Sequence, residues 1–335
     1  KCLRCQAQRM RADDCFLLPL TAGDQDIIDF YGVPEDPHKA APKLQRVLVN
    51  ADDDLKAEAL IINSEKPDRA RLLSLQGHGA GALYNSVAYG ETAVKCSDWV
   101  HGRRVRFGLP PAHGVIKCFC GKDLSQDTLL DRSNLECEHP LACNVLSKAK
   151  IVRHDAILKV IFAACKEAGI PSHREPRTLL EDEKRPDAFH RFTTKDALTD
   201  VVVPHPSAKA YVKGGSWRKK GMAAGRSANY KDNKYRLTAI NECATFFPLA
   251  VETYGYMHVA MHKFLKMVAS AAVEAGLSHE PAGAFPTAKI QAGRHYATLL
   301  TRVSVALLKG NAHCAFFFAR MADKSINAAA VHYFA

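Results

Sequence analysis

Two aspartates have the residue type and the spacing of a metal site. Asp187 and Asp200 lie in segments with the pattern of short strands, and three valines directly follow Asp200. If the two strands pair antiparallel around a turn centred between Thr193 and Thr194, both aspartates lie equally far from that turn. Their side chains would then face each other on one side of the sheet, with Cβ atoms about 5 Å apart.

Carboxylates that face each other across two strands destabilise a sheet unless a cation lies between them. Carboxylate oxygens are the ligands that Mg²⁺ and Mn²⁺ prefer, so Asp187 and Asp200 are predicted to bind one of these ions. The alternative interpretation is that the turn lies elsewhere and that the two residues are separate, exposed acids.

A basic helix face follows the two predicted strands. Lys231 and Lys234 are one helical turn apart, and Tyr235 lies four residues after Lys231. A lysine beside a divalent metal can orient the attacking water and neutralise charge that develops on phosphoryl oxygens. This combination fits hydrolysis of a phosphodiester, whereas the alternative is a solvated basic face without a catalytic role.

The elements that must position these residues alternate between helix and strand. Apolar residues recur at helical spacing in 152–169, and short β-branched or aromatic runs follow it. We expect a helix over 152–169, strands near 172–180, 186–192 and 198–204, a helix over 228–241, a strand over 245–253, and helices over 256–276 and 287–309. The sequence therefore predicts the α/β class, with a mixed sheet flanked by helices.

This order of elements, with Arg185-Pro186-Asp187 opening the second strand and Asp200 in the third, resembles the PD-(D/E)XK restriction-endonuclease fold. The likeness is closest to the restriction-like endonuclease of site-specific non-LTR retrotransposons, in which the catalytic lysine has moved from the third strand to the following helix. The same departure is present here, because Val202 stands where the general pattern has lysine and Lys231 and Lys234 lie in the helix.

The resemblance implies a Mg²⁺-dependent or Mn²⁺-dependent DNA endonuclease that leaves a 3′-hydroxyl. The roles that it implies are metal ligation by Asp187 and Asp200, catalysis by Lys234, support by Lys231 and Tyr235, and a further metal contact from Glu175 on the first strand.

The same family places a cysteine/histidine zinc knuckle directly before the nuclease. The matching segment of this chain contains Cys118, Cys120, Cys137, His139 and Cys143, four of which could complete a tetrahedral Zn²⁺ site. We predict that the ligands are Cys118, Cys120, His139 and Cys143. The gap between the two halves is longer than the family's spacing, and buried free cysteines are the alternative interpretation.

A basic loop with one indole lies between the third strand and the lysine-bearing helix. It contains Trp217, Arg218, Lys219 and Lys220, and we expect these residues to contact nucleic acid, since cations track phosphates and an indole can stack on a base. A loop that is merely solvated is the alternative.

The length of 335 residues is more than one compact core usually needs. We expect a helical linker over 1–112, the knuckle over 113–150, the endonuclease core over 151–255 and C-terminal helices over 256–335. Within Arg153-His154-Asp155, which also matches the family, His154 is either structural or a substitute zinc ligand.

The composition favours a polyanionic partner. Lysine and arginine outnumber the acids by 46 to 35, which gives a net charge of +11, although a solvated basic surface is the alternative.

No apolar stretch has the length of a membrane helix, and the N-terminus has no secretory signal core, so the sequence predicts a chain that is intracellular and without a membrane partner. Eleven cysteines in such a chain favour reduced thiols and a metal site over disulfides.

Two functions are therefore compatible with the sequence. The first is an active endonuclease that hydrolyses phosphodiester bonds of DNA and derives from a retroelement, in which case we expect the nucleus. The second is a domesticated, catalytically inactive relative that binds RNA as a structural subunit of a large ribonucleoprotein, such as an organellar ribosome. The absence of a recognisable reverse transcriptase and the irregular knuckle motivate the second hypothesis.

Overall fold

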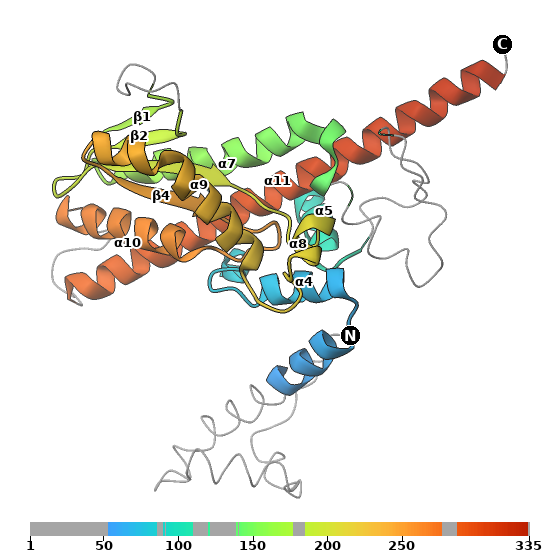
Figure 1. Cartoon of the computed structure of the whole chain (residues 1–335), viewed down its shortest axis with the longest axis horizontal. Coiled ribbons are helices and arrows are strands. Elements are labelled where there is room, and N and C mark those ends of the chain that lie inside the picture. Colours follow the sequence, from blue (N-terminus) through green and yellow to red (C-terminus); the bar gives the residue numbers. More distant parts are fainter. Residues whose placement is uncertain are drawn as a thin grey trace, which may run out of the picture. The chain divides into compact units, whose positions relative to one another are not determined.

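The computed structural model describes residues 53–85, 90, 92–109, 120, 139, 141–176, 185–276 and 287–333. The chain divides into two compact units, Lys1–Asn63 and Ser64–Ala335. In the first unit, the described residues 53–63 are helical. Every other element below belongs to the second unit, so the predicted boundaries after residues 112, 150 and 255 all fall inside that unit (Figure 1).

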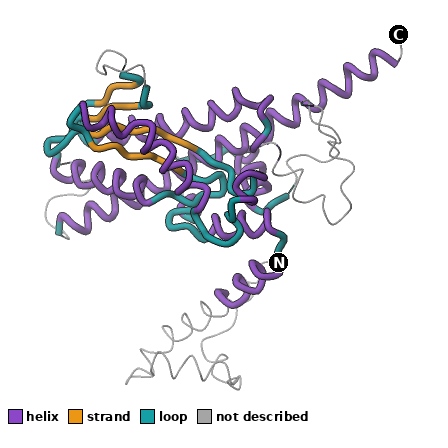
Figure 2. The backbone as a smooth tube through the Cα atoms, viewed as in Figure 1, coloured by secondary structure: helices purple, strands orange, loops and turns teal. Residues whose placement is uncertain are grey.

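A small mixed sheet forms the centre of the second unit. Its strands are β1 (Ser172–Arg174), β2 (Ala188–His190), β3 (Ala197–Val202) and β4 (Thr245–Ala250), arranged in the order β1-β2-β3-β4. The first two pairings are antiparallel, and β3 pairs with β4 in parallel. Figure 2 shows the strands in orange among the helices. The predicted α/β class and mixed sheet are confirmed, although each strand is shorter than the segment that the sequence predicts.

The register of the β2–β3 hairpin is the one predicted for the two aspartates. Ala188 pairs with Thr199, and Phe189 pairs with Leu198. Extending this antiparallel ladder by one residue places Asp187, directly before β2, opposite Asp200 in β3. The turn therefore centres where the sequence predicts it.

Three long helices share one hydrophobic core with the sheet: the first two pack against its strands, and the third packs against these two helices. They are α7 (Ser147–Glu167), α10 (Val259–Glu274) and α11 (Ala288–Tyr333). Ile157 and Ile161 of α7 pack in this core with Phe264 of α10 and Leu300 of α11. The helix α7 ends before Gly169, which adopts φ +68° and thus the left-handed conformation that terminates helices.

The C-terminal helix continues beyond its predicted end at residue 309. Gly310 follows directly, but α11 continues through it. Arg153 of α7 packs where a Cβ of Gly310 would lie. This glycine therefore permits a close helix–helix approach and does not act as a helix terminator.

The β3–β4 connection carries α8 (Lys209–Lys213) and α9 (Met222–Asn241), and α9 packs against β4 and β3. The helix α9 begins six residues before its predicted start at 228, with Gly221 at φ +73° as its N-cap. Upstream of α7 lie α4 (Lys66–Leu75), the 3₁₀ helix η2 (Ala82–Asn85), α5 (Cys96–Arg106) and the 3₁₀ helix η3 (Asn144–Leu146).

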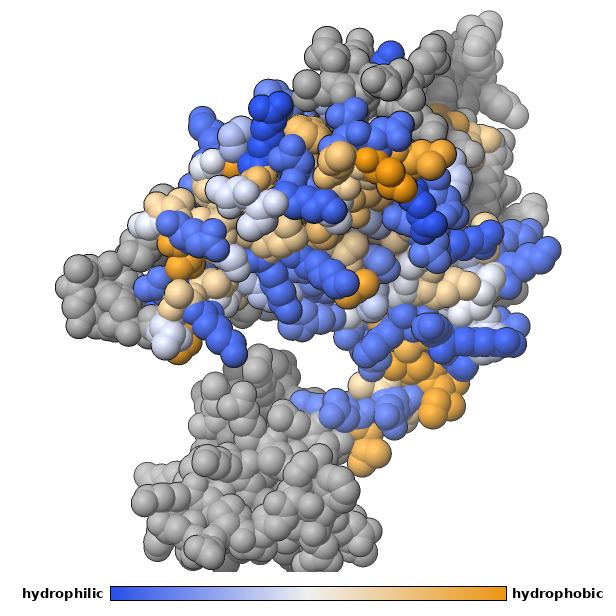
Figure 3. Space-filling view, turned by 60° about the vertical axis from the view of Figure 1, so that its left-hand side comes forward, coloured by the Kyte–Doolittle hydropathy of each residue, from blue (hydrophilic) through white to orange (hydrophobic). Residues whose placement is uncertain are grey.

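The surface drawn in Figure 3 is mostly hydrophilic, with small hydrophobic areas between the polar ones. Among the described residues, no helix combines the length and the apolar character that a bilayer crossing demands.

Candidate functional site

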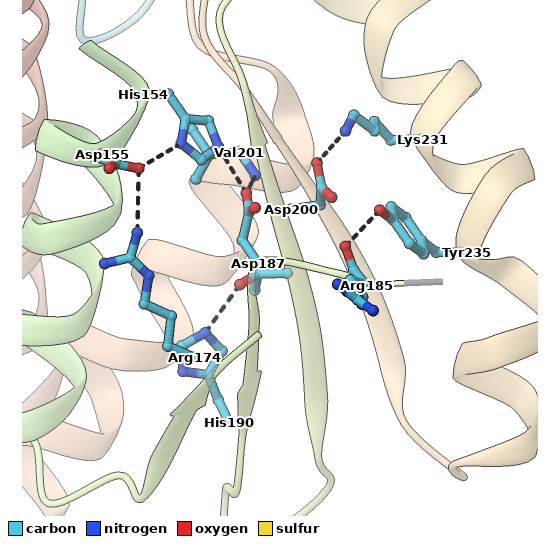
Figure 4. A network of polar contacts seen from close by, with 11 residues as sticks. His154, Asp155, Arg174, Arg185, Asp187, His190, Asp200, Val201, Lys231 and Tyr235 are labelled. Carbon is cyan, nitrogen blue, oxygen red and sulfur yellow. Dashed lines mark hydrogen bonds and ion pairs between the residues drawn. The ribbon is translucent and has the colours of Figure 1, made fainter. Parts of the chain in front are cut away.

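The site forms where β2, β3, α7 and α9 meet, and its centre is the Asp187–Asp200 pair (Figure 4). Asp200 is only 2% exposed, and the Nζ atom of Lys231 on α9 lies 2.6 Å from its Oδ1 atom. Within the described residues, this Oδ1 atom is buried and makes no hydrogen bond of good geometry. The charge of Asp200 is therefore balanced chiefly by one lysine.

Asp187 is held from two sides. Its Oδ2 atom accepts a hydrogen bond from the backbone N–H of Val201 at 2.6 Å and lies 2.9 Å from Nε2 of His154 on α7. The first contact joins Asp187 to β3 just beyond Asp200, so the carboxylate is fixed close to its partner strand. In the part of the chain that the structure describes, the other oxygen of Asp187, Oδ1, has no hydrogen-bond partner.

His154 is bracketed by two carboxylates. Its Nδ1 atom lies 3.1 Å from Oδ1 of Asp155, and Arg174 of β1 approaches the same oxygen at 3.4 Å. Burial opposes protonation, but the hydrogen bonds and charges of Asp187 and Asp155 raise the pKa of His154 to about 9. The imidazole is therefore a cation at neutral pH, and in this structure both of its ring nitrogens contact carboxylates.

The two central carboxylates influence each other. Burial and the negative charge of Asp187 raise the pKa of Asp200, whereas Lys231 opposes this shift. The raised pKa means that the negative charge of Asp200 is unfavourable in this buried position, and that the charge of Asp187 adds to the effect. The pair therefore has the electrostatic property that a metal-binding carboxylate pair needs.

Tyr235 fixes the backbone next to Asp187. Its ring is 1% exposed, and its hydroxyl donates a 2.8 Å hydrogen bond to the carbonyl oxygen of Arg185. Burial, followed by the charge of Asp200, raises the pKa of Tyr235 above its ordinary value. The phenol thus remains protonated and connects α9 to the segment that leads into β2.

The two lysines of α9 have different surroundings. Lys231 reaches Asp200, while Lys234 is exposed and lies with its Nζ atom 4.7 Å from the ring centroid of Tyr235. The structure therefore brings Lys231 into the carboxylate pair and leaves Lys234 at its edge.

Glu175 lies just past β1, not within the strand, and has a positive φ of 43°. Its backbone N–H donates to the carbonyl oxygen of Asp187 at 3.0 Å, but its side chain is exposed. The residue is therefore adjacent to the site through its backbone.

The donor set fits a hard divalent cation with few protein ligands. Asp187 and Asp200 offer two carboxylates at facing positions, and Mg²⁺ is commonly bound by one or two carboxylates together with water and phosphate. Among the described residues, no third acid, histidine or cysteine joins them in a tight cluster. Within the described residues, the protein ligands of such an ion would therefore be these two carboxylates, with water and substrate completing its coordination.

Three of the four predicted zinc ligands converge. The ligand atoms of Cys120, His139 and Cys143 all lie within 4.8 Å of one another, and Cys120 Sγ is 3.3 Å from His139 Nε2. Cys143 is buried in a cluster with Cys314 and Phe318. The fourth predicted ligand, Cys118, lies outside the described residues.

The predicted nucleic-acid loop surrounds its indole with cations. Trp217 is half-buried, and the charged groups of Lys66, Arg69 and Arg218 lie 5.2, 5.5 and 4.6 Å from its ring centroid. Lys219 and Lys220 follow as exposed residues. The structure thus adds α4 to the basic surface that the sequence predicts from this loop alone.

Asp155 and Arg174 belong to this site, although the sequence pattern does not predict a role for them. His154 was noted only as structural or as a zinc ligand, and its adjacency to Asp155 in the sequence was the one available signal. Comparison with protein-family models gives no matching family, and comparison with curated protein sequences gives no significant match.

Proposed function

We propose that this protein is a metal-dependent endonuclease that hydrolyses phosphodiester bonds of DNA. The observation that carries the proposal is the Asp187–Asp200 pair, in which the facing register, the burial of Asp200 and its contact with Lys231 occur together. A carboxylate pair beside a lysine suits phosphoryl transfer, because the transition state places negative charge on oxygens that cations can stabilise.

In this proposal Asp187 and Asp200 hold Mg²⁺ or Mn²⁺, which supplies positive charge that stabilises the attacking and leaving oxygens. Lys231 neutralises charge at the scissile phosphate and limits repulsion within the pair. His154 and the Val201 N–H keep Asp187 oriented, and Tyr235 holds the backbone of Arg185. The groups that orient the carboxylates thus come from strand β3 and from the two helices α7 and α9.

The basic surface around Trp217 supports a nucleic-acid substrate. Its cations come from α4 and from the loop before α9, the helix that also carries Lys231. The loop leads directly into α9, and Lys231 lies about 13 Å further along the axis of this helix than its first residue. One DNA strand could therefore contact both the basic surface around Trp217 and the carboxylate pair.

We assign a structural Zn²⁺ to Cys120, His139 and Cys143, with Cys118 as the fourth ligand. Thiolate and imidazole are the ligands that structural zinc sites use, and Cys143 anchors the site in the core around Phe318. The knuckle, the sheet and the relocated lysine together support the restriction-endonuclease-like fold and an origin in a retroelement.

The nuclease activity is tested by nicking of supercoiled plasmid DNA in the presence of Mg²⁺. We expect the wild type to nick the plasmid and EDTA to abolish nicking. Asp200→Asn should lower the rate about a hundredfold or more, whereas the matched control Asp196→Asn, in the turn of the same hairpin, should retain it. Cooperative thermal unfolding of the wild type and of Asp200→Asn verifies that both proteins are folded. Equal cutting of the plasmid by these two proteins would overturn the assignment.

A second function is supported by a specific feature of the same site. Each carboxylate already has a cationic partner, since His154 contacts Asp187 and Lys231 contacts Asp200. A domesticated relative that binds RNA as a structural subunit of a ribonucleoprotein would retain this arrangement without cutting. Co-sedimentation of the native protein with a ribonucleoprotein particle, combined with no nicking in Mg²⁺ or Mn²⁺, would favour this function and an organellar location over a nuclear one.

A further inference from the structure

A cavity of about 400 Å³ lies among α5, α7 and α11. Glycines let α11 approach both neighbours nearby, because a Cβ at Gly102 would meet Leu308 and a Cβ at Gly310 would meet Arg153. The cavity opens beside these close contacts and has the volume of a small-molecule site. It is therefore a product of how the three helices pack.

Three charged side chains line the cavity. Lys95 and Asp98 contribute from the start of α5, and Lys309 contributes from α11. Within the described residues, none of these three side chains takes part in an ion pair or a hydrogen bond. Two cations and one acid thus remain available to a ligand.

The rest of the lining combines partly exposed apolar residues with Ser97, His101 and His313. Phe316 is 54% exposed and Val152 is 46% exposed, and both line the cavity. An exposed aromatic ring beside unpaired cations matches a ligand with a flat ring and an anionic group. An acid at the same place accepts hydrogen bonds from amino groups.

The cavity is distinct from the Asp187–Asp200 site. It uses Val152 and Ala156 of α7, whereas His154 contacts Asp187. At 100° per residue, His154 points roughly opposite to Val152 and Ala156 on the helix. The two sites therefore use opposite faces of α7.

We propose that this cavity binds a nucleotide. Lys95 and Lys309 bind the phosphate, the base packs on Phe316, and Asp98 accepts a hydrogen bond from the exocyclic amine of the base. The nucleotide is either a free mononucleotide or one residue of a strand. The proposal does not depend on the nuclease activity.

Isothermal titration calorimetry of the full chain with AMP tests the binding. We expect saturable binding of AMP, with adenosine and inorganic phosphate each binding at least about tenfold more weakly, because each lacks one half of the contacts. IMP, which lacks the amine, should also bind more weakly than AMP. Equal affinity for AMP and adenosine, equal affinity for AMP and phosphate, or no binding of AMP would overturn the proposal.

Substitutions assign the contacts. Lys309→Glu and Lys95→Glu, the latter at the more exposed position, should each weaken the affinity for AMP about tenfold or more. The charge-matched control Lys263→Glu on α10 should leave this affinity unchanged. Asp98→Ala, which removes the acceptor oxygens, should weaken the binding of AMP without weakening that of IMP. If Lys309→Glu and Lys95→Glu both fold and bind AMP as the wild type does, the proposed site is wrong.

Competition identifies the source of the nucleotide. If a 5′-phosphorylated pentadeoxyadenylate displaces AMP, the cavity binds a nucleotide within a nucleic-acid strand. If it does not displace AMP, the cavity binds a free mononucleotide. Asp200→Asn should bind AMP normally, so a failure of the nuclease proposal and a failure of this proposal give different results.

Discussion

Lys231, and not Lys234, contacts Asp200, with Nζ 2.6 Å from Oδ1, although the two lysines are one turn apart on α9. We predict that Lys231→Ala lowers the rate of plasmid nicking roughly a hundredfold, because the cation nearest the carboxylate pair is lost. Lys234→Ala should stay within about threefold of the wild type, since its side chain is exposed. Initial nicking rates at saturating Mg²⁺ measure both.

If Lys234→Ala were instead the more impaired variant, the bound DNA would have to draw Lys234 into the site. That result would favour the catalytic role that the retrotransposon resemblance implies for Lys234. Lys231→Arg is a useful companion, because it keeps the charge of Lys231 while altering its shape.

The hairpin register could be predicted because it depends on symmetry within one short segment. Asp187 and Asp200 are equally distant from a single turn, so local pairing alone places them opposite each other. The choice between the lysines could not be predicted in the same way. Spacing places Lys231 and Lys234 about 60° apart on α9, and only packing of Tyr235 against the sheet rotates Lys231 inward.

The contact between His154 and Asp187 could not be predicted from the sequence either. These residues are 33 positions apart and belong to α7 and to the segment before β2, so their contact depends on how α7 packs across the sheet. The same reason applies to α4 and Trp217, because Lys66 approaches the indole from a helix far upstream. Long-range packing of this kind has no local sequence signal.

Loss of one exposed cysteine should abolish zinc binding. We predict that Cys120→Ser removes about one equivalent of bound zinc per chain, because Cys120 is one of the converging ligands. Cys243→Ser is the matched control, since Cys243 is also exposed and lies at the end of α9. Metal content measured by mass spectrometry after dialysis separates the two, and unchanged zinc in Cys120→Ser would contradict the proposed ligand set.

Buried histidines should make the fold sensitive to mild acid. Burial lowers the pKa of His190 from 6.5 to about 4 and that of His205 to about 3, so both are neutral in the folded state. Below pH 6.5 the unfolded chain binds protons that the folded chain does not, so stability falls as the pH decreases from 6.5 towards 4. For His190 alone, the full loss corresponds to about 3 kcal/mol.

Urea unfolding at a series of pH values measures this loss. His190→Gln should flatten the slope between pH 6.5 and 4, because glutamine can bond Ser172 and Thr199 without taking up a proton. His173→Gln, at an exposed position of the adjacent strand β1, should keep the wild-type slope. A wild-type stability that is constant over this range would contradict a neutral, buried His190.

The close approach of α11 to α7 predicts opposite effects for two helical glycines. A Cβ at Gly310 would lie 2.6 Å from Cγ and 2.8 Å from Cα of Arg153, so Gly310→Ala should push the helices apart and reduce the free energy of unfolding by about 2 kcal/mol. Gly225, inside α9, has nothing within 4 Å of such a Cβ. Gly225→Ala should therefore increase stability by about 0.5–1 kcal/mol, since alanine is the better helix former. Urea unfolding of both variants measures the difference, and a Gly310→Ala variant as stable as the wild type would contradict the packing of Arg153 against α11.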